Sequence, residues 1–230
     1  MSCQRRNSSQ IMKTKLKIIE YSNKMLEDRL TIGTGGNISI KTRENFVYIT
    51  PSGIPYERLK PEDISVLDLK GNLINGKKPS SETDLHLALY EKREDISSVI
   101  HCHSLYATVL ACMKMELPPI HYLVAFSGNK VPVADYAPFG TKALTDKTVL
   151  AMKNYNAVLM ANHGLLTSGM NVEHAYSVAL NIEFACNVYV KILSAGDPVI
   201  LNNGRIMDVK TRLDNYLAPF LTSPTFSEDK

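Results

Sequence analysis

Apolar residues recur along the chain at two spacings, one typical of helices and one typical of strands. Helical spacing runs through residues 10–30, and a long apolar stretch at 172–194 follows Asn171, which we expect to cap it. Short apolar runs bounded by Gly, Pro and Asn predict strands at 38–40, 46–49, 64–69, 98–103 and 157–161. Shorter helical patterns predict helices at about 104–114, 141–153 and 206–217, and one that begins at Ser81 in a capping box with Asp84.

Strands and helices alternate, and some connections are short enough for hairpins, as at Gly71-Asn72. No internal repeat or linker divides the chain. The pattern therefore predicts one α/β domain with a central mixed, mainly antiparallel sheet flanked by helices. We expect residues 1–9 to form a disordered tail, residues 10–220 the folded domain and residues 221–230 a C-terminal tail, with one or two short strands within 120–135.

The composition of the 230 residues, 44% hydrophobic and 21% charged, is that of an ordinary globular protein. The net charge of +3 arises from five basic residues before Glu20, so the remaining chain is slightly acidic and predicts no nucleic-acid partner. No apolar run approaches the roughly 20 residues that span a bilayer, and the N-terminus lacks the apolar segment of a secretory signal. The four cysteines show no CxxC spacing. We therefore expect a cytoplasmic protein that does not contact a membrane.

Three of the six histidines occupy positions suited to a metal ion. His101 and His103 are two residues apart in a predicted strand, so period 2 places both imidazoles on one face. His163 ends another buried strand and precedes Gly164, which allows close backbone approach. Three imidazoles with an open fourth position are typical of a catalytic Zn²⁺ site. The alternative is three strand-end histidines that each bond to the backbone and bind no metal.

Several small polar segments without cationic side chains could bind a phosphate group. They contain Gly36 and Asn37, Ser52 and Gly53, and Ser80 and Ser81, the last pair at the start of a predicted helix. Each segment is by itself also an ordinary turn or helix start. Glu82 follows in the first helical turn, where it either favours the helix dipole or acts as a general acid/base beside a metal. His86 lies one turn further on and could face the same way.

The motifs together resemble the class II aldolase and adducin-head superfamily, and most closely its L-fuculose-1-phosphate aldolases. The matching segments follow the order of that family: GTGGNISI (33–40), ITPSGIPYERL (49–59), GKKPSSETDLH (76–86), VIHCHSLYATVL (99–110), LPPIHYLVAFSGN (117–129), APFGTKAL (137–144) and ANHGLL (161–166). They cover most of the chain, from about residue 33 to 200.

The resemblance implies a function and a set of site residues. His101, His103 and His163 match the zinc ligands of the family, with one Zn²⁺ per subunit, and Glu82 matches a carboxylate that binds the zinc at rest and then acts as acid/base. The segments at Gly36-Asn37, Ser52-Gly53 and Ser80-Ser81 match its phosphate-binding segments. Tyr122 matches a catalytic tyrosine from the neighbouring subunit, and Tyr216 matches a second, C-terminal tyrosine. The implied assembly is a homotetramer with sites at subunit interfaces.

The implied reaction is reversible aldol cleavage of a ketose 1-phosphate, such as L-fuculose 1-phosphate or a related deoxyketose phosphate, in carbohydrate metabolism. Two related activities remain alternatives: methylthioribulose-1-phosphate dehydratase and L-ribulose-5-phosphate 4-epimerase. The epimerases typically carry Asp at the position of Glu82 and an acidic residue within the segment at 121–126, whereas this chain has Glu and no acid there. A non-enzymatic, adducin-like interaction module is a third alternative, although such modules lack the zinc ligands.

Overall fold

A single eight-stranded sheet organises the residues that the structure describes. This structure, a computed structural model, describes the backbone of residues 2–222 and the side chains of residues 8–218. The strand order is β4-β3-β2-β1-β5-β8-β7-β6. The strands are β1 (Asn37–Lys41), β2 (Phe46–Ile49), β3 (Ser65–Asp68), β4 (Leu73–Asn75), β5 (Ser98–Cys102), β6 (Val133–Ala134), β7 (Ala157–Met160) and β8 (Gly164–Gly169). Among these described strands only β6 and β7 pair in parallel, which confirms the predicted mixed, mainly antiparallel sheet.

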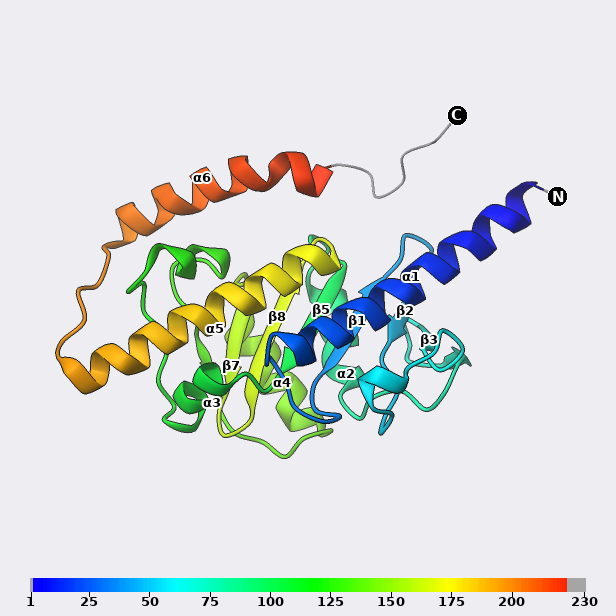
Figure 1. The fold of residues 1–230 in the computed structure, drawn as a ribbon, viewed down its shortest axis with the longest axis horizontal. Helices are drawn as coiled ribbons and strands as arrows, with labels where there is room; N and C mark the ends of the chain where they lie inside the picture. The colour runs from blue at the N-terminus through cyan, green and yellow to red at the C-terminus, as the bar shows by residue number, and fades with distance from the viewer. Residues whose placement is uncertain (1, 223–230) are drawn as a thin grey trace.

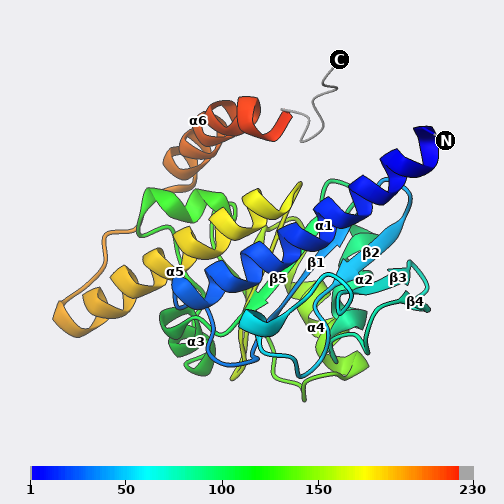
Figure 2. The same ribbon diagram turned by 45° about the vertical axis from the view of Figure 1, so that its right-hand side comes forward.

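Helices cover both faces of this sheet. On one face lie α1 (Ser2–Glu27), α3 (Leu105–Cys112) and α5 (Val172–Ala195), with α1 and α5 running across the front of the sheet in Figures 1 and 2. On the other face lie α2 (Thr83–Lys92) and α4 (Lys142–Met152). The final helix, α6 (Asn203–Thr222), lies apart from the sheet and packs on η2 (Tyr122–Phe126), while η1 (Tyr56–Arg58) contacts α1.

The sheet separates two hydrophobic cores because successive side chains of a strand point to opposite faces. On β5, Ile100 joins the core beneath α1, α3 and α5, whereas Val99 joins the core beneath α2 and α4. By the same alternation, His101 lies on the α2 face. The α2 face therefore has to accommodate the imidazole of His101 beside its apolar core.

The structure corrects the expectations for the ends of the chain. Helix α1 begins at Ser2, so residues 2–9 are helical and not the disordered tail that we expected. No Gly or Pro interrupts the segment, and a helix propagates more readily than it nucleates. At the other end, α6 extends from Asn203 to Thr222, beyond the predicted 206–217, and includes the first two residues of the expected 221–230 tail. Residues 1 and 223–230 lie outside the described residues.

Of two internal expectations, one is corrected and one is confirmed. The capping box at Ser81 is wrong, because α2 begins at Thr83 and Glu82 occupies the N-cap position without a side-chain cap bond. Ser80 makes the local bonds instead, since its carbonyl accepts from Thr83 and its hydroxyl accepts from the amide of Glu82. Within 120–135, the two-residue strand β6 confirms the expected short strand, and the 3₁₀ helix η2 precedes it.

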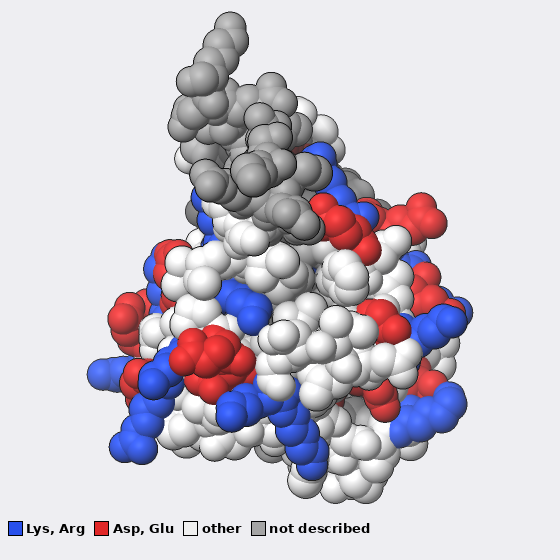
Figure 3. Space-filling view, turned by 90° about the vertical axis from the view of Figure 1, so that its right-hand side faces the viewer, with Lys and Arg blue, Asp and Glu red and all other residues white. Residues whose placement is uncertain are grey.

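The long apolar helix α5 satisfies the length and composition of a membrane span, which is weak evidence by itself. Nine of its side chains are buried, among them Val178 and Ile182, and they join the core of the sheet. This packing is that of a core helix in a globular domain. On the surface, charges of both signs are interspersed over the face shown in Figure 3.

Candidate active site

Three histidines meet at the ends of neighbouring strands on the α2 face. His101 lies in β5, His103 follows that strand, and His163 lies in the turn between β7 and β8. Their ligand nitrogens all lie within 4.8 Å of one another, and the Nε2 atoms of His101 and His103 are 2.9 Å apart. The turn comes this close because residue 164 has no side chain: a Cβ on Gly164 would lie 2.5 Å from the Cys102 carbonyl oxygen. The expected convergence of the three histidines is therefore present.

Glu82 completes the cluster from the start of α2. Its Oε2 lies 3.4 Å from His101 Nε2, and its Oε1 lies 3.4 Å from His163 Nε2. The residue is only 7% exposed, and within the described residues its Oε1 has no hydrogen-bond partner. A buried carboxylate oxygen without a partner is costly unless a cation or a proton donor compensates for it.

The protonation states of this cluster suit a cation. Burial lowers the pKa of His101 to about 4 and also lowers the pKa of His103, so both imidazoles are neutral near pH 7. The pKa of Glu82 lies below its usual value. Burial alone would raise this pKa, but His101, the Asn37 amide and His163 together lower it by more than burial raises it. Neutral imidazoles and an ionised carboxylate are the forms that bind a metal ion.

The residues therefore fit a divalent metal ion. His101 Nδ1 faces the Leu165 carbonyl oxygen at 3.0 Å, which places its proton there and leaves the lone pair of Nε2 directed at the cluster. A metal ion held by the three imidazoles and the Glu82 carboxylate would also compensate for the burial of Oε1, which has no hydrogen-bond partner among the described residues. Zinc suits this donor set, and other divalent ions accept the same ligands.

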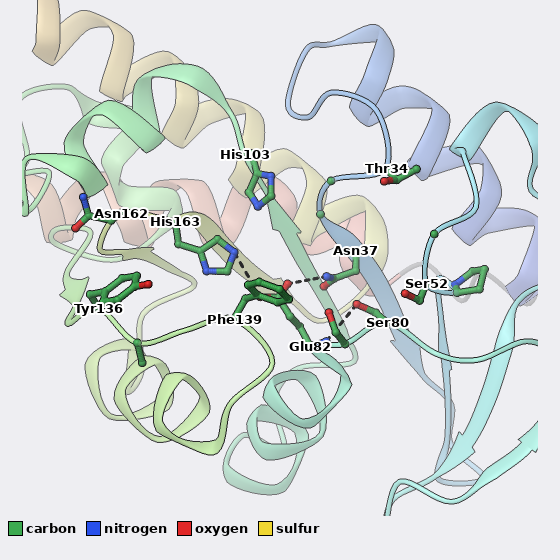
Figure 4. Close-up of a pocket in the computed structure, with 16 residues that line it drawn as sticks. Thr34, Asn37, Ser52, Ser80, Glu82, His103, Tyr136, Phe139, Asn162 and His163 are labelled. Atoms are coloured by element: carbon green, nitrogen blue, oxygen red, sulfur yellow. Dashed lines mark hydrogen bonds and ion pairs between the residues drawn. The ribbon is translucent and has the colours of Figure 1, made fainter.

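A cavity of about 510 Å³ opens beside the cluster, and the three predicted phosphate-binding segments line it. Asn37, Ser52 and Ser80 reach it from separate parts of the chain, as Figure 4 shows. The volume is within the range of small-molecule sites. Among the described residues that line it there is no Lys or Arg. A phosphate group there would bind to hydroxyl and backbone N–H groups.

The backbone geometry limits which of these groups are available. The amides of Ser52 and Ser80 already donate to the Lys78 and Thr50 carbonyl oxygens, so the two serines offer their hydroxyls to a ligand. Gly53 has φ +74°, and among the described residues no atom lies within 4 Å of the place a Cβ would take, so glycine is required there by conformation and not by space. Gly36, at φ +75°, is required by both, because a Cβ would lie 2.5 Å from the His101 carbonyl oxygen.

Hydrogen bonds from two side chains hold the glycine-rich loop at 33–36 in place. The Tyr56 hydroxyl, which is buried, donates to the carbonyl oxygens of Gly35 and Gly36 at 3.1 and 2.6 Å. Thr31 Oγ1 also donates to the Gly35 carbonyl oxygen at 2.8 Å. A side chain at Gly35 would lie 2.8 Å from His103 Nδ1. The loop therefore sits directly against one of the three histidines.

The two predicted tyrosines do not line this cavity. Tyr122 is 51% exposed in η2, and Tyr216 is 69% exposed in α6. Neither is among the residues of this chain that are described as lining it. The expectation that Tyr122 acts from a neighbouring subunit stays a prediction, as does the role of Tyr216.

The cavity also contains residues that the sequence reasoning did not select. Tyr136, Phe139 and Asn162 line it, and in Figure 4 Tyr136 and Asn162 lie on the far side of His163 from Thr34 and Ser52. Asn162 has φ +54°, a conformation that Asn tolerates better than most residues. The position of Asn162 directly before His163 could have identified it from the sequence as a residue of the site. Nothing in the sequence pattern around Tyr136 indicated a cavity.

Comparison with known proteins agrees with this arrangement. The sequence profile described as Class II Aldolase and Adducin N-terminal domain matches residues 16–190. The chain is 44% identical to a 5-deoxy-D-ribulose 1-phosphate aldolase of Bacillus thuringiensis, over 90% of this chain and 98% of that protein. It is 37% identical to the L-fuculose phosphate aldolase of Escherichia coli, over 87% and 94%.

A solved structure of an L-fuculose 1-phosphate aldolase has the same fold. It superimposes with a TM-score of 0.86 at 40% sequence identity, over 88% of this chain and 96% of that one. The profile match alone covers well over half of the chain. The protein therefore belongs to the class II aldolase and adducin family.

Proposed function

We propose that this protein is a zinc-dependent aldolase that reversibly cleaves a ketose 1-phosphate to dihydroxyacetone phosphate and a short aldehyde. We propose a 5-deoxyribulose 1-phosphate as the first candidate substrate and L-fuculose 1-phosphate as the second candidate. The observation that carries it is the His101, His103 and His163 cluster with Glu82, beside a cavity lined by the three predicted phosphate-binding segments. The order of substrates follows the identities of 44% and 37% to relatives of those two names.

Each group of the site has a role in this proposal. The hydroxyls of Ser52 and Ser80 and the backbone around Gly36 and Gly53 would bind the phosphate. The three histidines, with Glu82 at rest, would hold the metal ion. A bound Zn²⁺ supplies Lewis acidity toward the carbonyl group of the substrate, so no Schiff-base lysine is required.

Two proton transfers then complete the reaction. In the direction of synthesis, Glu82 would take a proton from C3 of dihydroxyacetone phosphate. The C3–C4 bond forms to the aldehyde carbon, and the aldehyde oxygen receives a proton from Tyr122. Cleavage reverses both transfers. Because Tyr122 lies outside the cavity of its own chain, a neighbouring subunit of a homotetramer would present this tyrosine. We propose that this tetramer acts in the cytoplasm.

The test is release of dihydroxyacetone phosphate, measured by coupling it to a NADH-dependent reductase. Purified, zinc-loaded protein would be assayed with 5-deoxyribulose 1-phosphate and with L-fuculose 1-phosphate, before and after treatment with a strong chelator. We expect release that the chelator abolishes and added Zn²⁺ restores. A Glu82→Gln variant serves as the matched control, because glutamine retains the shape of the side chain but lacks the carboxylate that acts as the base.

The other outcomes identify the alternatives. Loss of water from methylthioribulose 1-phosphate without cleavage would identify a dehydratase. Interconversion of L-ribulose 5-phosphate and its C4 epimer would identify an epimerase. A protein without stoichiometric zinc and without turnover would be an interaction module. Any of these results would contradict the proposed aldolase.

A further inference from the structure

A stripe of polar side chains is buried between α2 and β1, behind the cavity. Glu82, His86 and Tyr90 are four residues apart and so lie on one face of the helical segment. Asn37 and Ser39 alternate on β1 and lie on one face of the strand. All five are at most 7% exposed, and His86 and Ser39 are fully buried. Burying so many polar groups is costly unless each finds a partner.

The five side chains form one continuous chain of hydrogen bonds. Asn37 Nδ2 donates to Glu82 Oε2 at 2.9 Å, and Asn37 Oδ1 lies 2.6 Å from His86 Nε2. On the other side of the imidazole ring, His86 Nδ1 lies 2.7 Å from Ser39 Oγ. Ser39 Oγ in turn lies 2.6 Å from the Tyr90 hydroxyl. The chain therefore runs from the interior to the carboxyl group of the site.

The direction of each bond follows from its chemistry. Ionised Glu82 only accepts, so Asn37 must offer it the NH₂ group and turn its carbonyl oxygen to His86. That carbonyl only accepts, so His86 Nε2 carries the proton. Burial lowers the pKa of His86 to about 3, so the ring is neutral and Nδ1 is the acceptor. Ser39 therefore donates to His86, and Tyr90 donates to Ser39. The reverse orientation of the Asn37 amide would place its carbonyl oxygen against the carboxylate, two acceptors without a proton between them.

We propose that His86 is a positioning residue for Glu82 and acts through the amide of Asn37. Its Nε2–H holds the amide carbonyl oxygen of Asn37, and the amide NH₂ group in turn holds Glu82 Oε2. The other oxygen, Oε1, is left free of protein hydrogen bonds within the described residues and lies 3.4 Å from His163 Nε2. The hydrogen-bond chain thus holds Oε2 of Glu82 in place and leaves Oε1 available for the metal ion or the transferred proton. This inference rests on the proposed function.

The test compares two amide side chains of different length at position 86. In His86→Gln the side-chain NH₂ reaches the place of Nε2 and can still donate to Asn37. In His86→Asn the shorter side chain reaches the place of Nδ1, so it keeps Ser39 and loses Asn37. We expect His86→Asn to lower kcat and the apparent zinc affinity by about 10- to 100-fold with little change in KM. His86→Gln should restore most of both.

A double-mutant cycle separates positioning from stability. If His86 acts through Asn37, His86→Asn should cost nothing further in an Asn37→Ala background. Leu89→Ala, a buried apolar change on the same helix, is the control and should lower Tm with kcat unchanged. Equal kcat and zinc affinity in the Gln and Asn variants, or additive losses with Asn37→Ala, would overturn the proposal.

Zinc affinity is measured by competition with a chromophoric chelator and requires no substrate. If the wild-type protein cleaves no ketose phosphate but the zinc affinities still show this coupling, the positioning role stands and the proposed function fails. If the wild-type protein is an active aldolase and the two variants are alike in zinc affinity and kcat, only the positioning role fails.

Discussion

The two faces of the sheet carry opposite kinds of residue at strand β1. On β1, Asn37 and Ser39 point to α2, whereas Ile38 and Ile40 pack in the core under α1, α3 and α5. One face is thus filled like an ordinary core. The other face holds, beside its own apolar core under α2 and α4, a buried polar chain that ends at Glu82 and three histidines.

This difference shows where the fold gives up stability for chemistry. Apolar burial on the first face stabilises at roughly 25 cal/mol per Å². On the second face, each buried polar group has to regain by hydrogen bonding what it lost from water. Changes in the apolar cores and changes in the polar chain should therefore separate, with stability lost from the first and metal binding or turnover lost from the second.

The largest effect is expected for His103→Ala. Two imidazoles and one carboxylate make a poor zinc site, so the variant should lose both its zinc and its activity. Elemental analysis of the purified protein measures the first, and the dihydroxyacetone phosphate assay measures the second. Retained zinc with full turnover would remove His103 from the site.

Tyr122→Phe should affect turnover alone. The tyrosine lies in η2, which packs with α5 and α6, and it would reach a cavity only in a neighbouring subunit. Loss of a positioned proton donor lowers kcat by about 100-fold or more, while the zinc content stays the same. If zinc were lost with turnover, Tyr122 would have a structural role instead.

Ile182→Ala tests the apolar face. This fully buried residue of α5 should cost about 2–5 kcal/mol of unfolding free energy, because it leaves a cavity in the core. Zinc content and kcat below the melting temperature should not change. Urea unfolding measures the first, and a fall in zinc content of the folded protein would show that the two faces are coupled.

The polar face should also make the metal-free protein sensitive to acid. Burial lowers the pKa of His86 to about 3, so between about pH 6.5 and pH 3 the unfolded chain binds a proton there that the folded chain does not. Stability is complete above that window and falls as the pH drops through it, by up to about 1.4 kcal/mol per pH unit for this group. Urea unfolding at pH 7, 6 and 5 measures the slope, which His86→Gln should reduce.

Lys142→Ala should have the smallest effect. Its ion pair with Asp146 on α4 is exposed, at 85% and 59%, and such pairs contribute less than about 1 kcal/mol. Unfolding free energy, zinc content and kcat should all match the wild type. A measurable loss of zinc would mean that α4 transmits changes to the site.

The sequence predicted the parts of the site that depend on local spacing. The two-residue interval of His101 and His103, and the His163-Gly164 pair at a strand end, led to the histidine cluster that the structure contains. The mixed sheet and the Asn171 cap of α5 were also predicted. These features rest on period 2, on helical spacing and on cap chemistry, all of which are readable within a few residues.

The rest depends on long-range pairing that spacing does not reveal. The role of His86 requires β1 and α2 to come together, and its partner Asn37 lies 49 positions away. Strand β8 was missed because its turn follows β7 immediately and its register is set by β5. The capping box failed because Ser80, and not Ser81, bonds at the start of α2.

We expect the α2 face of the sheet to hold a metal ion among three histidines and Glu82. The most direct measurement is anomalous X-ray scattering at the zinc edge from a crystal of the zinc-loaded protein. We expect one strong peak per chain between the imidazoles of His101, His103 and His163. No peak there, or a peak held by other residues, would contradict it.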